Sequence, residues 1–268
     1  MTAARTSTTH LYAGFRHAGA LASVHAQRDS QRRVLALLPG ARLLIVGSAF
    51  GEEANCILYG TSRWMTVVAI DLADLASQVR RQPGLSALGS RLSCGQCDLL
   101  DAHTVQGYGG FDVAQCGFVL HDVRPQEKQH AMRQLAFAVR PGGHVIVSDI
   151  FSPMDQRQVS HAARVYDVFL REAVTARYLG HLTSRDFDEL VGDGGGPGLL
   201  RSREEAVQGS RDFFESMEET IARARCEGLL LQGVGRNPSN ADLAVLLFRR
   251  VDLRRERWTE AEEVVHVV

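Results

Sequence analysis

The stretch LLIVGSAFGEEANCIL, residues 43 to 58, decides the fold because its residue pattern changes from that of a strand to that of a helix. It begins with the continuous apolar run expected of a buried strand and ends with the apolar spacing of a helix. Between them, Gly47 and Gly51 border a turn that has Ala49 at its centre. A nicotinamide-binding turn requires the pattern GxGxxG, which this spacing does not match. The stretch by itself therefore predicts a strand, a tight turn and a helix.

The same alternation continues along the chain. Segments with apolar residues every three to four positions separate the runs LLIVG, TVVAID, RLSCGQCD, FDVAQCGFVL and HVIVSDIF. Strands and helices that alternate in this way predict an α/β protein with a doubly wound parallel sheet. Two later runs, LLLQGVG and ADLAVLLFRRV, bring the prediction to seven strands, with the last strand antiparallel.

The pattern divides the chain into four parts. We expect an N-terminal helical cap in residues 1–40, the sheet domain in residues 41–151 and 199–252, a helical insertion after strand five in residues 152–198, and a charged tail in residues 253–268. The insertion has no strand pattern and is placed where it would form a substrate lid. A single long helix is expected to begin at Ser202, because Glu205 follows at the spacing of a capping box.

The amino-acid composition of the chain limits the classes of molecule that it is expected to bind. With 30 basic and 31 acidic residues, the chain has a net charge of -1 and no overall field that would attract nucleic acid or an anionic membrane. No apolar run reaches the length of about 18 residues that a membrane span needs. Five cysteines without framework spacing suit a reducing compartment, so we expect a soluble, cytoplasmic protein that binds a small molecule.

Cys94 and Cys97 form the CxxC pair CGQC. Such a pair would be half of a metal site or a redox pair. We favour the interpretation that they are ordinary strand residues, because no second ligand pair is placed to complete a tetrahedral site.

Five ordered motifs between Leu43 and Asp149 resemble the class I S-adenosylmethionine-dependent methyltransferases, of the type that acts on small molecules. The turn VGSAFGEEA is similar to the family's GxGxG, with Gly47, Ser48, Ala49 and Gly51 in its positions. Alanine replaces the middle glycine, which is tolerated where the backbone dihedrals are ordinary. LAFAVRPGGHVIVSD is similar to the family's helix, turn and fifth strand. The resemblance implies a Rossmann-like fold and S-adenosylmethionine as the cofactor.

The resemblance also implies cofactor contacts beyond the turn. Asp71 ends the second strand, twenty residues after Gly51, where the family has a carboxylate that accepts both ribose hydroxyls. Asp98 follows the third strand, where the family's acidic residue accepts a hydrogen bond from the adenine amine. The neighbours of these two residues and the end of strand four, at the methionine end of the cofactor, complete the set: Leu72, Leu99, Gln115, Cys116 and Gly117.

His121 is the candidate catalytic base. Its segment VLHDV resembles the LHDW segment of the small-molecule O-methyltransferases, in which the histidine takes the proton of the acceptor hydroxyl, and its near-neutral pKa suits that task. A histidine that merely begins a helix is the alternative interpretation, and Val123 departs from the family's tryptophan. Asp122 is expected to cap the following helix. On the strength of His121, oxygen is the favoured acceptor atom, with nitrogen and carbon left open.

The acceptor is expected to contact Phe118 and the helical insertion. Candidates in the insertion are His161, Arg164, Tyr166 and Tyr178, although residues at helical spacing more often form a core. No metal is expected, because Asp122 with Asp149 is only part of a magnesium ligand set.

The main interpretation is a methyltransferase of specialised metabolism. One alternative stays open because of Ala49: a protein that keeps the fold and the cofactor but catalyses a non-methylating reaction, such as a cyclisation, or serves as a binding partner. A second copy of the chain also remains an open partner.

Overall fold

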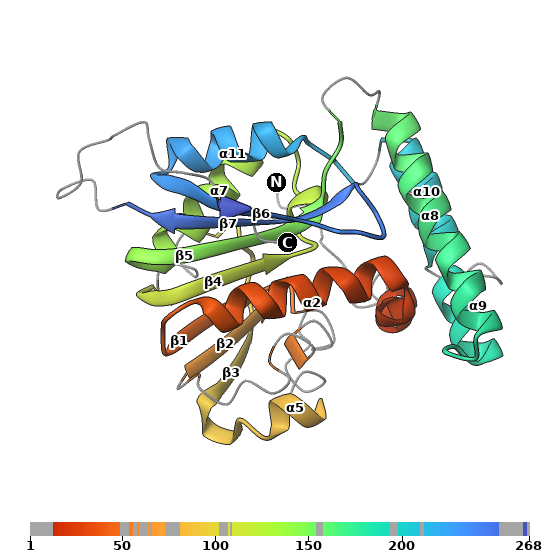
Figure 1. Cartoon of the computed structure of the whole chain (residues 1–268), viewed down its shortest axis with the longest axis horizontal. Coiled ribbons are helices and arrows are strands. Elements are labelled where there is room, and N and C mark those ends of the chain that lie inside the picture. Colours follow the sequence, from red (N-terminus) through yellow and green to blue (C-terminus); the bar gives the residue numbers. More distant parts are fainter. Residues whose placement is uncertain are drawn as a thin grey trace.

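A computed structural model of the chain describes residues 13–48, 54–55, 58, 64, 66–72, 81–101, 107, 109–153, 158–192, 198–209, 212–251 and 265–266. Its centre is an eight-stranded sheet of order β3-β2-β1-β4-β5-β7-β6-β8 (Figure 1). The strands are β1 (Arg42–Val46), β2 (Thr66–Asp71), β3 (Leu92–Gln96), β4 (Phe111–Gly117), β5 (Val139–Ile150), β6 (Leu229–Arg236), β7 (Leu243–Arg250) and β8 (Val265–His266).

The seven predicted strands are all present, and the predicted α/β class is confirmed. β1 to β5 pair in parallel, and β7 is antiparallel to both β5 and β6. β8 is an eighth strand that the sequence did not predict: two residues of the charged tail pair in parallel with β6. The outer side of β6 would otherwise present unpaired backbone groups, and β8 covers part of it.

Helices lie on both faces of the sheet (Figure 1). The described helical elements are η1 (Ala13–Ala20), α2 (Ala22–Leu37), α5 (Pro83–Ser86), η2 (Gly89–Arg91), η3 (Leu120–Asp122), α7 (Lys128–Ala138), α8 (Gln158–Tyr178), α9 (Ser184–Val191), α10 (Leu199–Val207) and α11 (Met217–Cys226). Side chains of α2 and α5 pack on one apolar face, whereas α7 and α11 pack on the other. None of the helices in the described part of the chain combines the length and the apolar character needed to cross a bilayer.

The prediction of one long helix after Ser202 is wrong. The chain forms α10, leaves the helix through Gly209 at φ +70°, and starts α11 only after Ser216. Ser216 and Glu219 make the capping box, since the Ser216 side chain accepts from the Glu219 backbone and the Glu219 side chain accepts from the Ser216 backbone. The sequence carries the same Ser-to-Glu spacing at both places, and the prediction used the wrong one.

The helical layer α8, α9 and α10 stands beyond the carboxyl ends of the central strands (Figure 1). α10 packs on α8 and α9 rather than on the sheet. Glu172 of α8 accepts hydrogen bonds from the backbone N–H and the hydroxyl of Ser23, at the start of α2. Arg164 of α8 forms an ion pair with Asp242, beside β7. The insertion is thus attached to both the N-terminal cap and the sheet; its role as a lid, and the division of the chain into domains, stay predictions.

Candidate active site

The carboxyl ends of β1, β4 and β5 meet at the edge of the sheet that faces the helical layer (Figure 1). β1 and β4 are neighbours in the sheet but not along the chain, so the connections that leave them diverge. Open parallel sheets bind ligands beyond the carboxyl ends of the strands at such a point. This edge is therefore where the ligand is expected.

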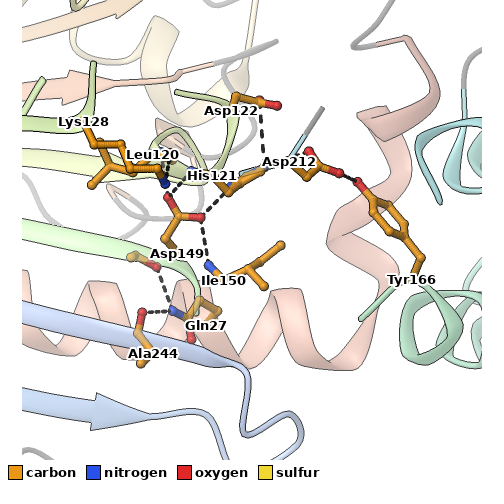
Figure 2. Close-up of polar contacts among 11 residues, drawn as sticks. Gln27, Leu120, His121, Asp122, Lys128, Asp149, Ile150, Tyr166, Asp212 and Ala244 are labelled. Atoms are coloured by element: carbon orange, nitrogen blue, oxygen red, sulfur yellow. Dashed lines mark hydrogen bonds and ion pairs between the residues drawn. The ribbon is translucent and has the colours of Figure 1, made fainter. Parts of the chain in front are cut away.

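Asp149, near the end of β5, fixes the orientation of His121, which follows β4 in η3 (Figure 2). His121 Nδ1 donates to Asp149 Oδ1 over 2.5 Å. The backbone N–H groups of Leu120 and Ile150 donate to the two oxygens of the same carboxylate over 2.7 and 2.8 Å. We assign the proton of the neutral ring to Nδ1, because its partner is an ionised carboxylate. Nε2 is then the atom left for chemistry.

Nε2 faces two more carboxylates. It lies 3.8 Å from Asp122 Oδ2 and 3.9 Å from Asp212 Oδ1, both longer than a hydrogen bond. Tyr166 of α8 donates to the other oxygen of Asp212 over 2.5 Å, which links the helical layer to the histidine (Figure 2). The backbone N–H of Phe213 donates to the carbonyl of His121 over 2.5 Å. The segment between α10 and α11 is thus attached directly to η3.

These contacts shift the pKa values of His121 and Asp149. Burial by itself would lower the pKa of His121, but the charges of Asp149, Asp122 and Asp212 and the hydrogen bond to Asp149 outweigh it and raise the pKa to about 9. For Asp149, burial opposes ionisation, yet the charge and hydrogen bond of His121 hold the carboxyl pKa below its usual value. The resting site therefore holds an imidazolium among carboxylates.

Lys128 of α7 lies behind this pair. Its side chain is 2% exposed, and Nζ donates to the carbonyl of Leu120 over 2.8 Å. Burial lowers the pKa of Lys128, while the charges of Glu215 and Asp149 oppose that effect. The ammonium helps to close η3 and places a positive charge on the inner side of Asp149.

Phe214 joins two histidines. Its ring stacks on His121 with the centroids 6.1 Å apart, and the ring of His161 meets it edge to face at 5.1 Å. His161 belongs to α8 and is fully buried. Arg164 donates to its Nδ1 over 3.0 Å, so Nε2 carries the proton of the neutral ring, and that atom has no hydrogen-bond partner among the described residues.

No family model and no curated protein sequence matches this chain. Solved structures do match. An O-methyltransferase family protein from Burkholderia thailandensis superposes with a TM-score of 0.58 at 17% identity, over 85% of this chain and 58% of that one. The mitomycin 7-O-methyltransferase MmcR superposes with a TM-score of 0.55 at 16% identity, over 84% of this chain and 54% of that one.

A Burkholderia thailandensis 1,6-didemethyltoxoflavin-N1-methyltransferase, solved with 1,6-didemethyltoxoflavin and S-adenosylhomocysteine bound, superposes with a TM-score of 0.56 at 15% identity. That match covers 91% of this chain and 85% of the other. This chain has the class I methyltransferase fold. It spans a little more than half the length of the first two relatives.

In this methyltransferase fold, Gly47 begins the turn after β1. Its φ is +77°, and a Cβ at this position would collide with Val119, so only glycine fits. The backbone N–H groups of Gly47 and Ser48 both donate to the carbonyl of Ile70, over 3.0 and 3.2 Å. The predicted contacts Ala49 and Gly51 lie outside the described residues.

The acidic residues of the predicted cofactor site end neighbouring strands. Asp71 is the last residue of β2 and is 6% exposed. The carbonyl of Leu72 accepts from the Gln96 amide over 3.0 Å. Asp98 Oδ1 accepts from the backbone N–H of Leu100 over 2.9 Å, which closes a turn, and Leu99 is buried. Asp71 and Asp98 follow adjacent strands, so the structure brings them to the same edge of the sheet.

The predicted residues of β4 differ in position. Gln115 is completely buried within the strand, and neither atom of its amide has a partner among the described residues. Cys116 packs in the core on the opposite face. Gly117 ends the strand, and Phe118 then turns the chain at φ +53°, with its N–H donating to the carbonyl of Ser148. Gly117 and Phe118 are thus at the ligand edge, whereas Gln115 lies deeper in the sheet.

The candidates from the insertion fall into two groups. Tyr166 lies beside the His121 site through Asp212, and His161 and Arg164 lie near it through Phe214. Tyr178 is the last residue of α8 and is 88% exposed, so no described contact links it to the His121 site, and its place in the acceptor site stays a prediction. Helical spacing alone did not show which end of α8 faces the sheet.

Two groups of the site were not predicted from the sequence. Asp149 was considered only as a partial metal ligand, although its place at the end of the fifth strand could have shown that it meets the residue after strand four. Asp212 was hidden within the predicted long helix, and no spacing in the sequence connects it with His121. His121, Asp122 and Asp212 offer three ligand atoms within 4.8 Å of one another, a set that the sequence analysis, which expected no metal, did not foresee.

Proposed function

We propose that this chain transfers a methyl group from S-adenosylmethionine to a small-molecule acceptor, and that His121 removes the proton of the acceptor. The observation that carries this proposal is the His121–Asp149 pair at the carboxyl ends of β4 and β5. Its Nε2 is directed away from Asp149, toward Asp122 and Asp212 (Figure 2).

Three features support the cofactor. Gly47 turns the chain sharply after β1 at a φ of +77° that favours glycine, Asp71 places a carboxylate at the end of β2, and Asp98 places a second one after β3. These residues fit a nucleoside, because one planar carboxylate accepts both ribose hydroxyls. The 1,6-didemethyltoxoflavin-N1-methyltransferase, which shares the fold, was solved with S-adenosylhomocysteine bound.

The chemistry requires little of the protein. When bound, S-adenosylmethionine supplies a methyl group on a positively charged sulfur, which is already activated for displacement. The chain holds the acceptor in line with that methyl group, and His121 in its neutral form, after Nε2 has lost its own proton, takes up the proton of the acceptor there. Asp149 keeps the ring in the required orientation and stabilises the imidazolium that forms. We extend the proposal to specialised metabolism because the similar structures include a mitomycin 7-O-methyltransferase.

Calorimetry with S-adenosylhomocysteine tests the cofactor. We expect binding at about micromolar strength, and Asp71→Ala should weaken it by about 1.5 to 3 kcal/mol, the value for a hydrogen bond to a charged group. Absence of binding to the native protein would remove the proposal. Incubation of the protein and a panel of small molecules with methyl-labelled S-adenosylmethionine then separates methyl transfer from a non-methylating use of the cofactor, because only the first labels the acceptor.

A further inference from the structure

Lys128 is the only lysine of the chain. The sequence has 30 basic residues, and all the others are arginines. Lys128 is the first residue of α7 and is 2% exposed. A lysine carries a compact ammonium on a flexible stem, whereas an arginine carries a wide, planar group. The single lysine therefore places a compact cation in the interior, at a position that the sequence analysis did not consider.

The ammonium of Lys128 lies close to the pair that forms the candidate base. Its Nζ donates to the carbonyl of Leu120 over 2.8 Å. The backbone N–H of Leu120 in turn donates to Asp149 over 2.7 Å, and Asp149 accepts from the ring of His121. Figure 2 shows Lys128 and Asp212 on opposite sides of His121. Leu120 thus connects the ammonium with the carboxylate that orients the ring.

The charges around Lys128 show which carboxylate it balances. A buried ammonium is costly unless negative charge lies near it. The charged groups that act on Lys128 are Asp149 of β5, Glu215 before α11, and Glu219 and Arg223 of α11. Glu215 has its own cation, because Arg223 Nε lies 3.0 Å from its Oε2. The cations that act on Asp149 are His121 and Lys128.

Asp149 depends on its two cations unequally as His121 changes its charge. While the ring is an imidazolium, His121 itself balances the carboxylate. A neutral ring, which is the form that accepts a proton, leaves Asp149 as an anion that is only 2% exposed. The backbone N–H groups that donate to it carry no net charge. A buried carboxylate takes up a proton unless a positive charge stays near it, and Lys128 supplies that charge.

We propose that Lys128 is a positioning residue for His121: its buried ammonium balances Asp149 whenever the ring is neutral, so that Asp149 stays ionised and keeps the ring oriented as a proton acceptor. This inference rests on the proposed function, in which His121 takes up the proton of the methyl acceptor. Lys128 acts through Asp149 and keeps its own protons. The proton that moves leaves Nε2 for solvent before each turnover and is replaced there by the proton of the acceptor.

The same ammonium also affects the pH at which His121 becomes neutral. The titratable groups around the ring are Asp149 of β5, Asp122 of η3, Asp212 before α11 and, beyond Phe214, His161 of α8. Burial disfavours the imidazolium, whereas the three carboxylates favour it. A fixed positive charge on the inner side disfavours it further. Removal of the ammonium should therefore raise the pKa of His121 above its value of about 9.

A single lysine permits a first test on the native full-length chain. Lysine labelled with carbon-13 at Cε gives one NMR signal, from Lys128, and its chemical shift follows the charge of Nζ. Nitrogen-15 histidine in the same sample reports His121, whose signal is absent from His121→Gln. We expect His121 to lose its proton near pH 9 while Lys128 still holds its own. A Lys128 that becomes neutral at a lower pH than His121 would overturn the proposal.

The second test removes the charge. Lys128→Met replaces the ammonium by an apolar group on a flexible stem, and it should raise the pKa of His121 by about 0.5 to 1 unit. The rising limb of kcat/KM against pH should move with it, so that the rate falls about 3- to 10-fold at pH 7 and recovers at the plateau above the midpoint. Arg133→Met is the matched control, because Arg133 is on the same helix and pairs with Glu227 at the surface. It should leave the pKa and the pH profile unchanged.

Two results with the variant would overturn the inference. An unchanged pKa of His121 in folded Lys128→Met would show that the ammonium does not act on the pair. A rate that falls by the same factor at every pH would give Lys128 a structural role only. If Lys128→Met does not fold, the order of the two titrations in the native protein decides. Those titrations need neither cofactor nor acceptor, so failure to bind S-adenosylhomocysteine contradicts the proposed function, and a reversed order contradicts the role of Lys128.

Discussion

His121 and His161 lie against the same phenylalanine, yet burial and charge act on them with opposite outcomes. Both rings contact Phe214, and both are buried. The pKa of His121 is raised to about 9, because carboxylates overcome its burial. The pKa of His161 is lowered, chiefly by burial, with the nearby Arg164 acting in the same direction and Asp242 against it.

The difference shows what turns a buried histidine into a proton acceptor. Asp149 touches the ring of His121 directly, whereas Asp242 reaches His161 only through Arg164, which brings its own positive charge. A carboxylate in direct contact favours the charged ring, and one placed behind an arginine does so less. Only His121 therefore combines a fixed ring, a high proton affinity and an accessible partner atom at the ligand edge.

The two histidines should differ most in how far their replacement lowers the rate of methyl transfer. His121→Gln should lower the rate of methyl transfer by about 100- to 10,000-fold, the usual value of a general base. His161→Gln should lower it by less than about tenfold, because His161 lies behind Phe214. The rates are measured with methyl-labelled S-adenosylmethionine and an acceptor from the labelling panel. S-adenosylhomocysteine should bind both variants as it binds the native protein, and equal losses of rate would contradict the distinction.

Replacement of Asp149 and of Asp242 by asparagine should lower the pKa values of the two histidine rings by different amounts. Asp149→Asn should lower the pKa of His121 by more than about one unit, since it removes both a charge and a charged hydrogen bond. It should also cost about 1 to 3 kcal/mol in the free energy of unfolding, because two backbone N–H groups lose an ionised partner. Asp242→Asn should lower the pKa of His161 by a smaller amount. NMR titration of the ring nitrogens measures both shifts, and a larger effect at His161 would be inconsistent with direct contact at His121.

The two rings should also give the stability opposite dependences on pH. A pKa raised to about 9 means that the contribution of His121 is present below its unfolded value of about 6.5 and is lost as the pH rises through about 9. A lowered pKa means that the folded state gains stability from His161 as the pH rises toward about 6.5. Urea unfolding of the native protein, His121→Gln and His161→Gln across this range compares the slopes. Slopes of the same sign for the two histidines would refute the assignment.

The smallest expected effect is at Arg164. Arg164→Met should raise the pKa of His161 by less than about one unit, because a neighbouring positive charge is removed while burial remains. The loss of the partly exposed ion pair with Asp242 should cost at most about 1 kcal/mol. The pKa of His121 should stay the same. A shift at His121 in this variant would show that the two rings are coupled through Phe214.

The sequence predicted the sheet because its signals are local. The apolar runs from Leu43 to Asp149 and the turn at Gly47 each depend on a few neighbouring residues, and the structure has the strands at those places. The prediction of one long helix failed for the same reason. Ser202 with Glu205 and Ser216 with Glu219 have the same local spacing, and only tertiary contacts select the second pair as the capping box. β8 forms through pairing with β6, and the sequence of its two residues does not predict that pairing.

The site was predictable only in part. His121 and Asp71 follow strands at recognisable intervals, so motif and spacing reach them. Asp212 meets His121 across 91 residues of sequence, through a segment that the pattern assigned to a helix. Tyr166 and Tyr178 sit on one helix with similar spacing, yet one donates to Asp212 and the other is exposed to solvent. The part of a helix that meets a site depends on how the helix packs on the rest of the protein, and the periodicity of the sequence does not predict this packing.

The most direct measurement is a titration of the two histidine rings in one sample, by nitrogen-15 NMR of the native protein with S-adenosylhomocysteine bound, with His121→Gln and His161→Gln to assign the signals. The account predicts that His121 titrates near pH 9, with Nδ1 keeping its proton throughout, and that His161 stays neutral down to a pH below its usual value. Two rings that titrate together near pH 6.5, or a His121 that titrates below His161, would contradict the claim that Asp149, Asp122 and Asp212 make His121 the proton acceptor of the site.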